Sequence, residues 1–259
     1  MSGHSKWSTI KRAKEINDLK KARYFTKALN QIVVSVKDGG DSIESNFMLK
    51  LAIENAKSLN IPTKSIESAI KKGSGEDKEY SKFENIFYEA YGPENVSILI
   101  ECFTDNKNRL IADIRTVLDR NGGKLVNNGT IGWQFELQVL FTLQIESDID
   151  KKNKAKYNSN NNNLHKIIDK DEFENDLIDV EGIIDYYLEE DRFYIYVLPE
   201  KIQIMKGFLE DQEIIIENVE KTYISKVKVD ISEENFEKLD HLVDLLSNIE
   251  NVENVYINV

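Results

Sequence analysis

The side chains that could do covalent or metal chemistry in this chain are few and scattered. The only cysteine is Cys102, and the three histidines stand at positions 4, 165 and 241. One cysteine excludes an internal disulfide and any zinc site built from several cysteines. Cys102 lies in an apolar run typical of a buried thiol, and the adjacent His4 and Ser5 have no acidic residue beside them to orient the imidazole. We therefore expect no catalytic residue, no metal and no cofactor, and hence a protein that is not an enzyme.

Two short segments resemble ligand-binding loops but lack their key positions. Gly73, Gly75 and Lys78 do not form a phosphate-binding P-loop, because the glycine-lysine-serine/threonine ending is missing and no strand leads into the segment. Asp148 and Asp150 begin like a calcium loop, but the glycine required at its sixth position and the glutamate at its twelfth are absent. Neither segment predicts an ion or nucleotide site.

The distribution of charge is the feature that points to a partner. The net charge is −12, yet residues 1–72 hold 14 Lys and Arg against 7 Asp and Glu, while the remainder holds 20 against 39. A basic module on an acidic body is typical of a protein that contacts nucleic acid through one part of its chain. Solvated helix faces, which need no partner, would give the same counts, and both interpretations stay open here.

The expected nucleic-acid contacts lie in the N-terminal arm and along the first helices. Small residues in the arm permit close approach, the cations bind phosphates in a salt-dependent way, and Trp7 offers an indole that either stacks on a base or packs the start of a helix. Lysines outnumber arginines, which favours backbone contacts over bidentate reading of base edges. The candidate residues are Gly3, His4, Ser5, Lys6, Trp7, Lys11, Arg12, Lys14, Lys20, Lys21, Arg23, Lys27, Lys71 and Lys72.

Apolar residues recurring every three or four positions predict a small helical bundle at the start of the chain. The first helix spans residues 7–36 and ends at Gly39-Gly40. A second helix covers residues 49–59 and stops before Pro62. A third begins near Ile66 and ends with basic residues in its last turn and a glycine stop at Gly73.

Alternating patterns and turn signals after residue 80 predict two α/β units. Residues 84–91 and 96–103 are expected strands, followed by a helix that Asp105 caps and by a strand at 131–135. The next set reads strand, helix, strand, strand, helix, strand, at 139–145, 171–180, 183–188, 193–198, after Pro199, and at 214–219. The last set is a strand at 227–231, a helix at 232–248 with Ser232 as its cap, and a strand at 252–257. The Asn- and Lys-rich residues 151–163 are expected to be a disordered loop, at about 149–165.

Neither the 84–135 set nor the last set can cover its own sheet, so we expect the two to form one discontinuous domain. The predicted fold class is α+β: a basic helical domain at 1–80, then two ferredoxin-like α/β domains. The first of these comprises 81–136 plus 222–259, and the second, 137–221, is inserted in it. Three units in a row remain the alternative.

Several blocks in order carry a resemblance to a known family. The opening Met1-Ser2-Gly3-His4-Ser5-Lys6-Trp7-Ser8-Thr9-Ile10-Lys11-Arg12 resembles the start of the YebC/PmpR family, which includes the translational activator of mitochondrial cytochrome c oxidase subunit I. The match continues, densely up to residue 136, through Phe25-Thr26-Lys27, Gly39-Gly40-Asp41, Leu51-Ala52-Ile53, Ala56-Lys57, Asn60-Ile61-Pro62, Ile66-Glu67, Ala69-Ile70-Lys71-Lys72-Gly73, Tyr88-Glu89-Ala90-Tyr91-Gly92-Pro93, Glu101-Cys102-Phe103-Thr104-Asp105-Asn106 and Asn121-Gly122-Gly123. It is thin after that, and its last block is Asn254-Val255-Tyr256.

The resemblance implies three domains and control of gene expression without enzymatic turnover. Bacterial members are described as DNA-binding transcriptional regulators, and other members are similar to ribosome-associated factors that assist translation of difficult stretches. Our first hypothesis is a translation factor that binds ribosomal RNA or the ribosome. A duplex-DNA transcriptional regulator is second, and a protein-interaction scaffold is third. We expect a monomer in the cytoplasm, or in a mitochondrion or another organelle if the source is eukaryotic, and no membrane contact, because no apolar run approaches the ~20 residues of a membrane span.

Overall fold

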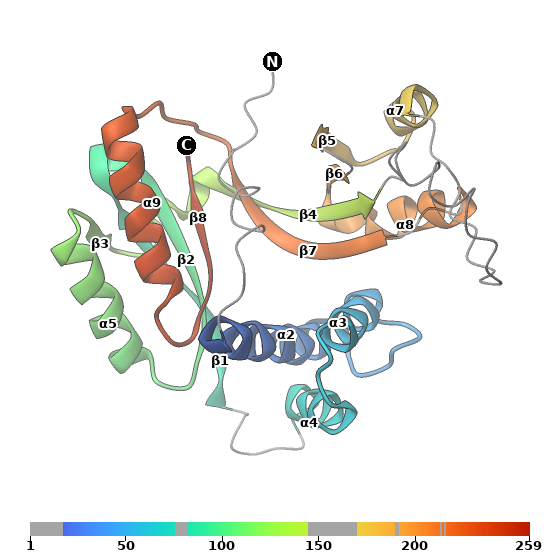
Figure 1. Ribbon diagram of the computed structural model, residues 1–259, viewed down its shortest axis with the longest axis horizontal. Coiled ribbons are helices and arrows are strands. Elements are labelled where there is room, and N and C mark those ends of the chain that lie inside the picture. The colour runs from blue at the N-terminus through green and yellow to red at the C-terminus, as the bar shows by residue number, and fades with distance from the viewer. Residues whose placement is uncertain (1–17, 76–81, 145–169, 190–191, 213, 215) are drawn as a thin grey trace. The chain divides into compact units, whose positions relative to one another are not determined.

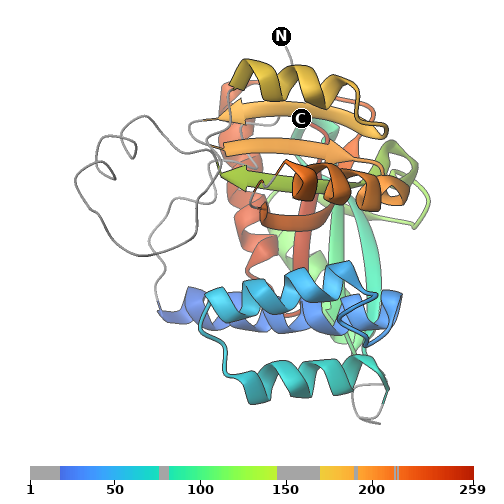
Figure 2. The same ribbon diagram turned by 90° about the vertical axis from the view of Figure 1, so that its right-hand side faces the viewer.

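The computed structural model of the chain describes residues 18–75, 82–144, 170–189, 192–212, 214 and 216–259, without the side chains of residues 18–23, 144, 170 and 172 (Figures 1 and 2). The chain divides into two compact units. One comprises Met1–Glu136 with Ile224–Val259, and the other comprises Leu137–Tyr223. Each unit is described by itself below.

The described part of the first unit begins with three helices: α2 (Asp18–Gly39), α3 (Phe47–Ser58) and α4 (Thr63–Gly73). Helix α2 packs against both of the others (Figure 2). The core is the predicted apolar stripe, with Ile32, Leu49 and Ala56 fully buried. Burial of these stripes is what stabilises short helices that would be marginal in water. The predicted start of the first helix, residues 7–17, lies outside the described residues.

Gly73 has a different role from the predicted helix stop. It is the last residue of α4, and Ser74 is the C-cap. A Cβ on Gly73 would lie 2.6 Å from Cβ of Val36 and 2.9 Å from the carbonyl oxygen of Val33. The glycine is therefore required by the close approach of α4 to α2, which a pattern of local stop signals does not reveal.

The sheet of the first unit has the strand order β3-β1-β2-β8, and its three pairings are antiparallel. Its strands are β1 (Glu84–Tyr91), β2 (Ser97–Thr104), β3 (Lys124–Val126) and β8 (Val252–Ile257). Helices α5 (Lys107–Arg120) and α9 (Glu233–Ser247) cover one face (Figure 1). The last strand of the chain thus completes the sheet that β1 begins, with Leu99 opposite Tyr256.

The two faces of β2 serve two cores, because side chains alternate along a strand. Ile98, Ile100 and Cys102 pack under α5 and α9, whereas Phe103 points to the other face and joins the core of the helical bundle. Cys102 is fully buried, and burial raises the pKa of its thiol, so it is the inert core residue that its apolar surroundings predicted.

The second unit follows the predicted order of strand, helix, strand, strand, helix, strand. Its elements are β4 (Phe135–Gln144), α7 (Lys170–Ile178), β5 (Ile183–Glu189), β6 (Arg192–Val197), α8 (Ile202–Asp211) and β7 (Ile216–Ser225). The sheet order is β5-β6-β4-β7. Phe173 of α7 packs edge-on against Phe193 of β6, with ring centroids 5.0 Å apart. The predicted α+β fold class is confirmed, since N-terminal helices are followed by two four-stranded antiparallel sheets. The domain bounds remain our proposal.

Two predicted strands are wrong. Residues 131–135 form a short 3-10 helix, Gly132–Gln134, and β4 begins only at Phe135. The carboxylate of Glu89 accepts the N–H groups of Gly129, Ile131 and Gly132, so these groups cannot join a strand ladder. Residues 227–231 are not a strand either, although Val229 N–H donates to the carbonyl of Asn258 at 2.8 Å.

Two predicted helix caps also differ. Asn106, not Asp105, is the N-cap of α5, and its Oδ1 accepts the N–H of Arg109 at 3.1 Å. Ser232 stands at the N-cap of α9, but its side chain makes no cap bond, because its hydroxyl donates to Glu94 at 3.0 Å. The bonds that Glu94 accepts from Asn235 and Ser232 lower the pKa of Glu94. The predicted loop at 151–163 lies outside the described residues.

Candidate nucleic-acid interface

The fourteen predicted contact residues fall into three groups according to how much of each the structure describes. Those outside the described residues are Gly3, His4, Ser5, Lys6, Trp7, Lys11, Arg12 and Lys14. Lys20, Lys21 and Arg23 belong to the first part of α2, residues 18–23, of which only the backbone is described. Lys27, Lys71 and Lys72 are described with their side chains.

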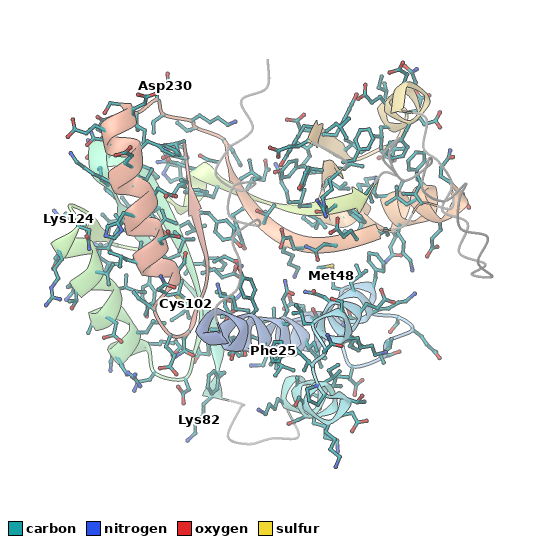
Figure 3. The ribbon with its side chains drawn as sticks, in the orientation of Figure 1. Phe25, Met48, Lys82, Cys102, Lys124 and Asp230 are labelled. Atoms are coloured by element: carbon teal, nitrogen blue, oxygen red, sulfur yellow. The ribbon has the colours of Figure 1, made fainter. Side chains whose placement is uncertain are left out.

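Lys27 joins α2 to β8, the last strand of the sheet. The label of Phe25, two residues before Lys27, marks this part of α2 in Figure 3. Its ammonium donates to the main-chain carbonyl of Glu253 in β8. One turn further along α2, the amide of Asn30 donates to Oε1 of Glu253 at 2.6 Å. The half-buried Lys27 therefore has a structural role in the first unit, and its contact with nucleic acid stays a prediction.

The carboxyl of Glu253 is the charged centre of this contact. Burial raises its pKa above the ordinary value for glutamate, and the negative charge of Glu101 acts in the same direction. The hydrogen bond from Asn30 and the positive charge of Lys27 act against that shift. The site is thus built to hold the bundle on the sheet, with α2 supplying both groups that favour the ionised form.

A second carboxylate, Glu101, lies on the same face of the sheet as Phe103. It accepts hydrogen bonds from Asn85 at 3.1 Å, Asn254 at 3.0 Å and the Tyr256 hydroxyl at 2.8 Å. Sequence reasoning missed both carboxylates. The signal available was polar residues in register on neighbouring strands, because Glu101 pairs with Asn254 in the ladder.

Lys71 and Lys72 lie in the last turn of α4, where cations also interact favourably with the helix dipole. Lys71 is exposed and Lys72 is partly buried. The next residue, Gly73, packs against Val36, which is sixteen residues after Lys20 in α2. At 1.5 Å per residue this is roughly 24 Å along the helix. The structure therefore separates the two α4 lysines from the basic start of α2.

The helical part of the first unit keeps its positive charge in the described range. Residues 18–75 hold ten Lys and Arg against six Asp and Glu. Within the described residues, no group of three or more His, Cys, Asp or Glu side chains could hold a metal ion. None of the helices in that part of the chain has the length and apolarity needed to cross a membrane.

Comparisons with known proteins match the whole chain. Residues 5–76 match the model "TACO1/YebC protein N-terminal domain", and residues 83–259 match "TACO1/YebC second and third domain". A relative from Caldanaerobacter subterraneus subsp. tengcongensis, named "Probable transcriptional regulatory protein TTE1135", is 37% identical over 260 residues, covering 100% of this chain and 98% of its own. Bacillus subtilis YrbC, "Probable transcriptional regulatory protein YrbC", is 34% identical over 258 residues, 100% and 99% of the two chains.

A solved structure agrees with the fold. The "Conserved Hypothetical Protein Aq1575" from Aquifex aeolicus superposes with a TM-score of 0.77 at 30% sequence identity, covering 95% of this chain and 93% of that one. With family models over nearly its full length and relatives above 30% identity, this chain belongs to the TACO1/YebC family.

Proposed function

We propose that this chain is a non-enzymatic gene-expression factor that binds nucleic acid through its basic N-terminal domain. The observation that carries the proposal is the charge of that domain: residues 1–72 hold twice as many Lys and Arg as Asp and Glu, while the rest of the chain is strongly acidic. The relatives support the same class, since they are named as regulatory proteins and not as enzymes. Because those relatives are bacterial, we also propose a cytoplasmic location.

The finer proposal is a translation factor that binds ribosomal RNA or the ribosome. A lysine-rich surface neutralises phosphates without reading base edges, which suits a large folded RNA. The second candidate is a duplex-DNA regulator, which the printed names of the relatives favour. Specific DNA recognition requires side chains that address base edges in a groove, so the two candidates differ in their selectivity among duplex sequences.

The salt dependence of binding tests the role of the basic domain. Replacing Lys11, Arg12, Lys14, Lys20 and Lys21 with glutamine is expected to weaken binding of single-stranded RNA. The slope of log affinity against log salt should become shallower by up to about 3.5, at about 0.7 per lost phosphate contact. A control of equal charge change replaces five exposed cations elsewhere: Lys107, Arg109, Arg115, Lys228 and Lys238. Equal slopes for the two variants would contradict the assignment.

Sedimentation with ribosomes separates the two candidates. A ribosome factor should co-sediment with ribosomal particles at about 0.1 M salt and leave them at about 0.5 M, because its contacts release counterions. Duplex binding by the same protein should then be abolished by unrelated competitor DNA. Binding to one duplex sequence that exceeds other sequences by roughly 10³-fold, without ribosome association, would place the DNA-regulator hypothesis first.

A further inference from the structure

Trp133 is a large aromatic side chain that the fold leaves in solvent. It lies in the 3-10 helix Gly132–Gln134, which precedes β4, and it is 65% exposed. Its indole N–H donates to the carbonyl of Thr130 at 3.0 Å, which fixes the orientation of the ring. The molecule therefore presents one flat aromatic face in a defined direction.

The buried carboxylate of Glu89 in the neighbouring strand β1 anchors the loop that carries Trp133. Glu89 of β1 is only 6% exposed and accepts N–H bonds from Gly129 at 2.7 Å, Ile131 at 2.6 Å and Gly132 at 3.1 Å. A Cβ on residue 132 would lie 2.9 Å from a Glu89 oxygen, so a larger residue there would displace the carboxylate. These bonds hold the backbone on the N-terminal side of the tryptophan.

The C-terminal side is anchored as well. The Gln134 side chain accepts the hydroxyl of Ser97 at 3.0 Å, and the Gln134 carbonyl accepts the N–H of Lys226 at 2.7 Å. A ring held from both sides loses little conformational freedom when a ligand covers it, and such preorganisation increases affinity. An exposed tryptophan on this frame has the properties of a binding platform.

The chemistry around Trp133 favours a nucleobase as the ligand. Asn127 and Asn128 are exposed in the same loop and offer amide groups, and the exposed Thr130 hydroxyl, which donates to the carbonyl of Asn127 at 2.6 Å, offers an acceptor oxygen. Residues 120–135 contain no Asp or Glu, in a chain that has 46 of them, and include Arg120 and Lys124. A phosphate backbone is therefore not repelled by residues of this segment.

A protein partner would call for a broader apolar surface. Among the described residues after 82 in the first unit, the large exposed apolar side chains are Trp133 and Val227. Interface hot spots are fully desolvated pockets built from several such groups. One ring beside amides fits a base, which needs a π-face to stack on and hydrogen-bonding groups at its edge.

We propose that Trp133 is a stacking platform for an unpaired nucleobase. This inference rests on the proposed nucleic-acid-binding function and adds a second contact point, outside the basic helices. Phosphate contacts of the N-terminal domain supply the salt-dependent affinity, and Trp133 supplies a contact that is independent of salt and specific for single strands.

Two measurements on the full-length chain test the proposal. Trp133 becomes the only tryptophan in a Trp7→Phe variant, since the chain has two. Titration of that variant with a mixed-sequence single-stranded RNA of about twelve nucleotides should quench the Trp133 emission, and duplex RNA of the same sequence should not. In the wild-type background, Trp133→Ala should lower the affinity for the labelled single strand by roughly 5- to 100-fold, with an unchanged salt slope.

The control is Ile178→Ala, which removes another exposed apolar side chain, 72% exposed, from the second unit. It should bind RNA like the wild type. Normal RNA affinity of Trp133→Ala, together with loss of binding in the five-cation variant, would overturn the platform while leaving the proposed function intact. Equal quenching of the Trp133 emission by duplex and by single-stranded RNA would also overturn the platform. So would quenching by a mixture of ribosomal proteins when single-stranded RNA causes none. Failure of the wild-type protein to bind any RNA or DNA would remove the proposed function itself.

Discussion

The buried carboxylate of Glu89 provides the sharpest test of how this fold positions an exposed loop. The side chain accepts three main-chain N–H groups at 2.6–3.1 Å from residues 129, 131 and 132. Glu89→Gln keeps the shape but replaces one oxygen with an NH₂ group, which points a donor at a donor. The NH₂ group replaces either Oε1, which leaves the partly buried Gly129 N–H without its acceptor, or Oε2, which leaves the N–H groups of Ile131 and Gly132 without theirs. The remaining bonds lose their charge assistance.

The expected cost is the sum of these two effects. An unsatisfied buried amide costs about 1–3 kcal/mol, and exchanging a charged for a neutral acceptor costs about 1 kcal/mol more. We expect Glu89→Gln to lower the free energy of unfolding by about 2–4 kcal/mol, and hence the melting temperature by roughly 5–15 °C for a protein of this size. The matched control is Glu84→Gln in the same strand, because Glu84 is exposed and pairs with Lys107 at 2.7 Å. A surface pair of this kind is worth about 0–1 kcal/mol.

Urea unfolding followed by tryptophan emission measures both variants in a Trp7→Phe background, where Trp133 is the reporter. Glu89→Gln should also lower the emission anisotropy of Trp133 before unfolding, because the loop is no longer held from below. If Glu89→Gln and Glu84→Gln change stability by amounts within about 0.5 kcal/mol of each other, the carboxylate does not hold the loop and the reasoning is refuted.

Three further changes probe the first unit. Asn46→Ala removes a buried amide that accepts from Leu49 N–H at 3.0 Å and donates to the carbonyls of Ser35 and Gly40 at 2.7 Å each, and should cost about 2–4 kcal/mol in urea unfolding. Gly73→Ala should cost about 1–3 kcal/mol in urea unfolding, because its Cβ would overlap Cβ of Val36 and the carbonyl oxygen of Val33, and Val36→Ala in the same chain should not recover that loss, because both of these atoms remain. The raised pKa of Glu253 means that its contribution to stability is present below about pH 4 and is lost as pH rises through the folded-state value. The difference in unfolding free energy between Glu253→Gln and the wild type should therefore favour the variant more at pH 7 than at pH 4. A difference that favours the variant more at pH 4 would contradict the raised pKa of Glu253.

Elements with a regular pattern could be predicted from the sequence alone. The apolar repeat that includes Ile32 and Val36 places α2, and its end at Gly39 is marked by the pair Gly39-Gly40. In the second unit, alternation and turn residues predicted, in the correct order, the four strands and two α-helices that the structure describes there. These features are local, since they depend on side chains within one or two turns or on successive strand positions.

Features set by contacts between distant residues could not be predicted. The segment 131–135 has the composition of a strand, but Glu89, about forty residues earlier, binds its amides. Ser232 is a residue type that commonly caps helices, but its hydroxyl donates a hydrogen bond to the Glu94 carboxylate instead. Gly73 resembles a helix stop, but the side chain and backbone of α2 determine its role. In each case a specific tertiary partner overrides the local preference.

A contact between distant residues also shapes the candidate site, because Lys27 of α2 is bound to Glu253 of β8. This contact affects which cations of α2 can bind phosphate. A phosphate that takes the ammonium of Lys27 must break its bond to the Glu253 carbonyl. It also removes the positive charge of Lys27 from beside the partly buried Glu253 carboxyl, and that charge favours the ionised form of the carboxyl. Leaving a partly buried carboxylate without its cation costs free energy, so binding modes that spare Lys27 are favoured. Because Lys20 and Arg23 precede Lys27 by about two turns and one turn of α2, phosphate contacts at the start of the helix are compatible with an intact Lys27–Glu253 contact. Nucleic acid bound there would be held beside the sheet of the first unit, since the same helix is fastened to β8 by Lys27 and Asn30.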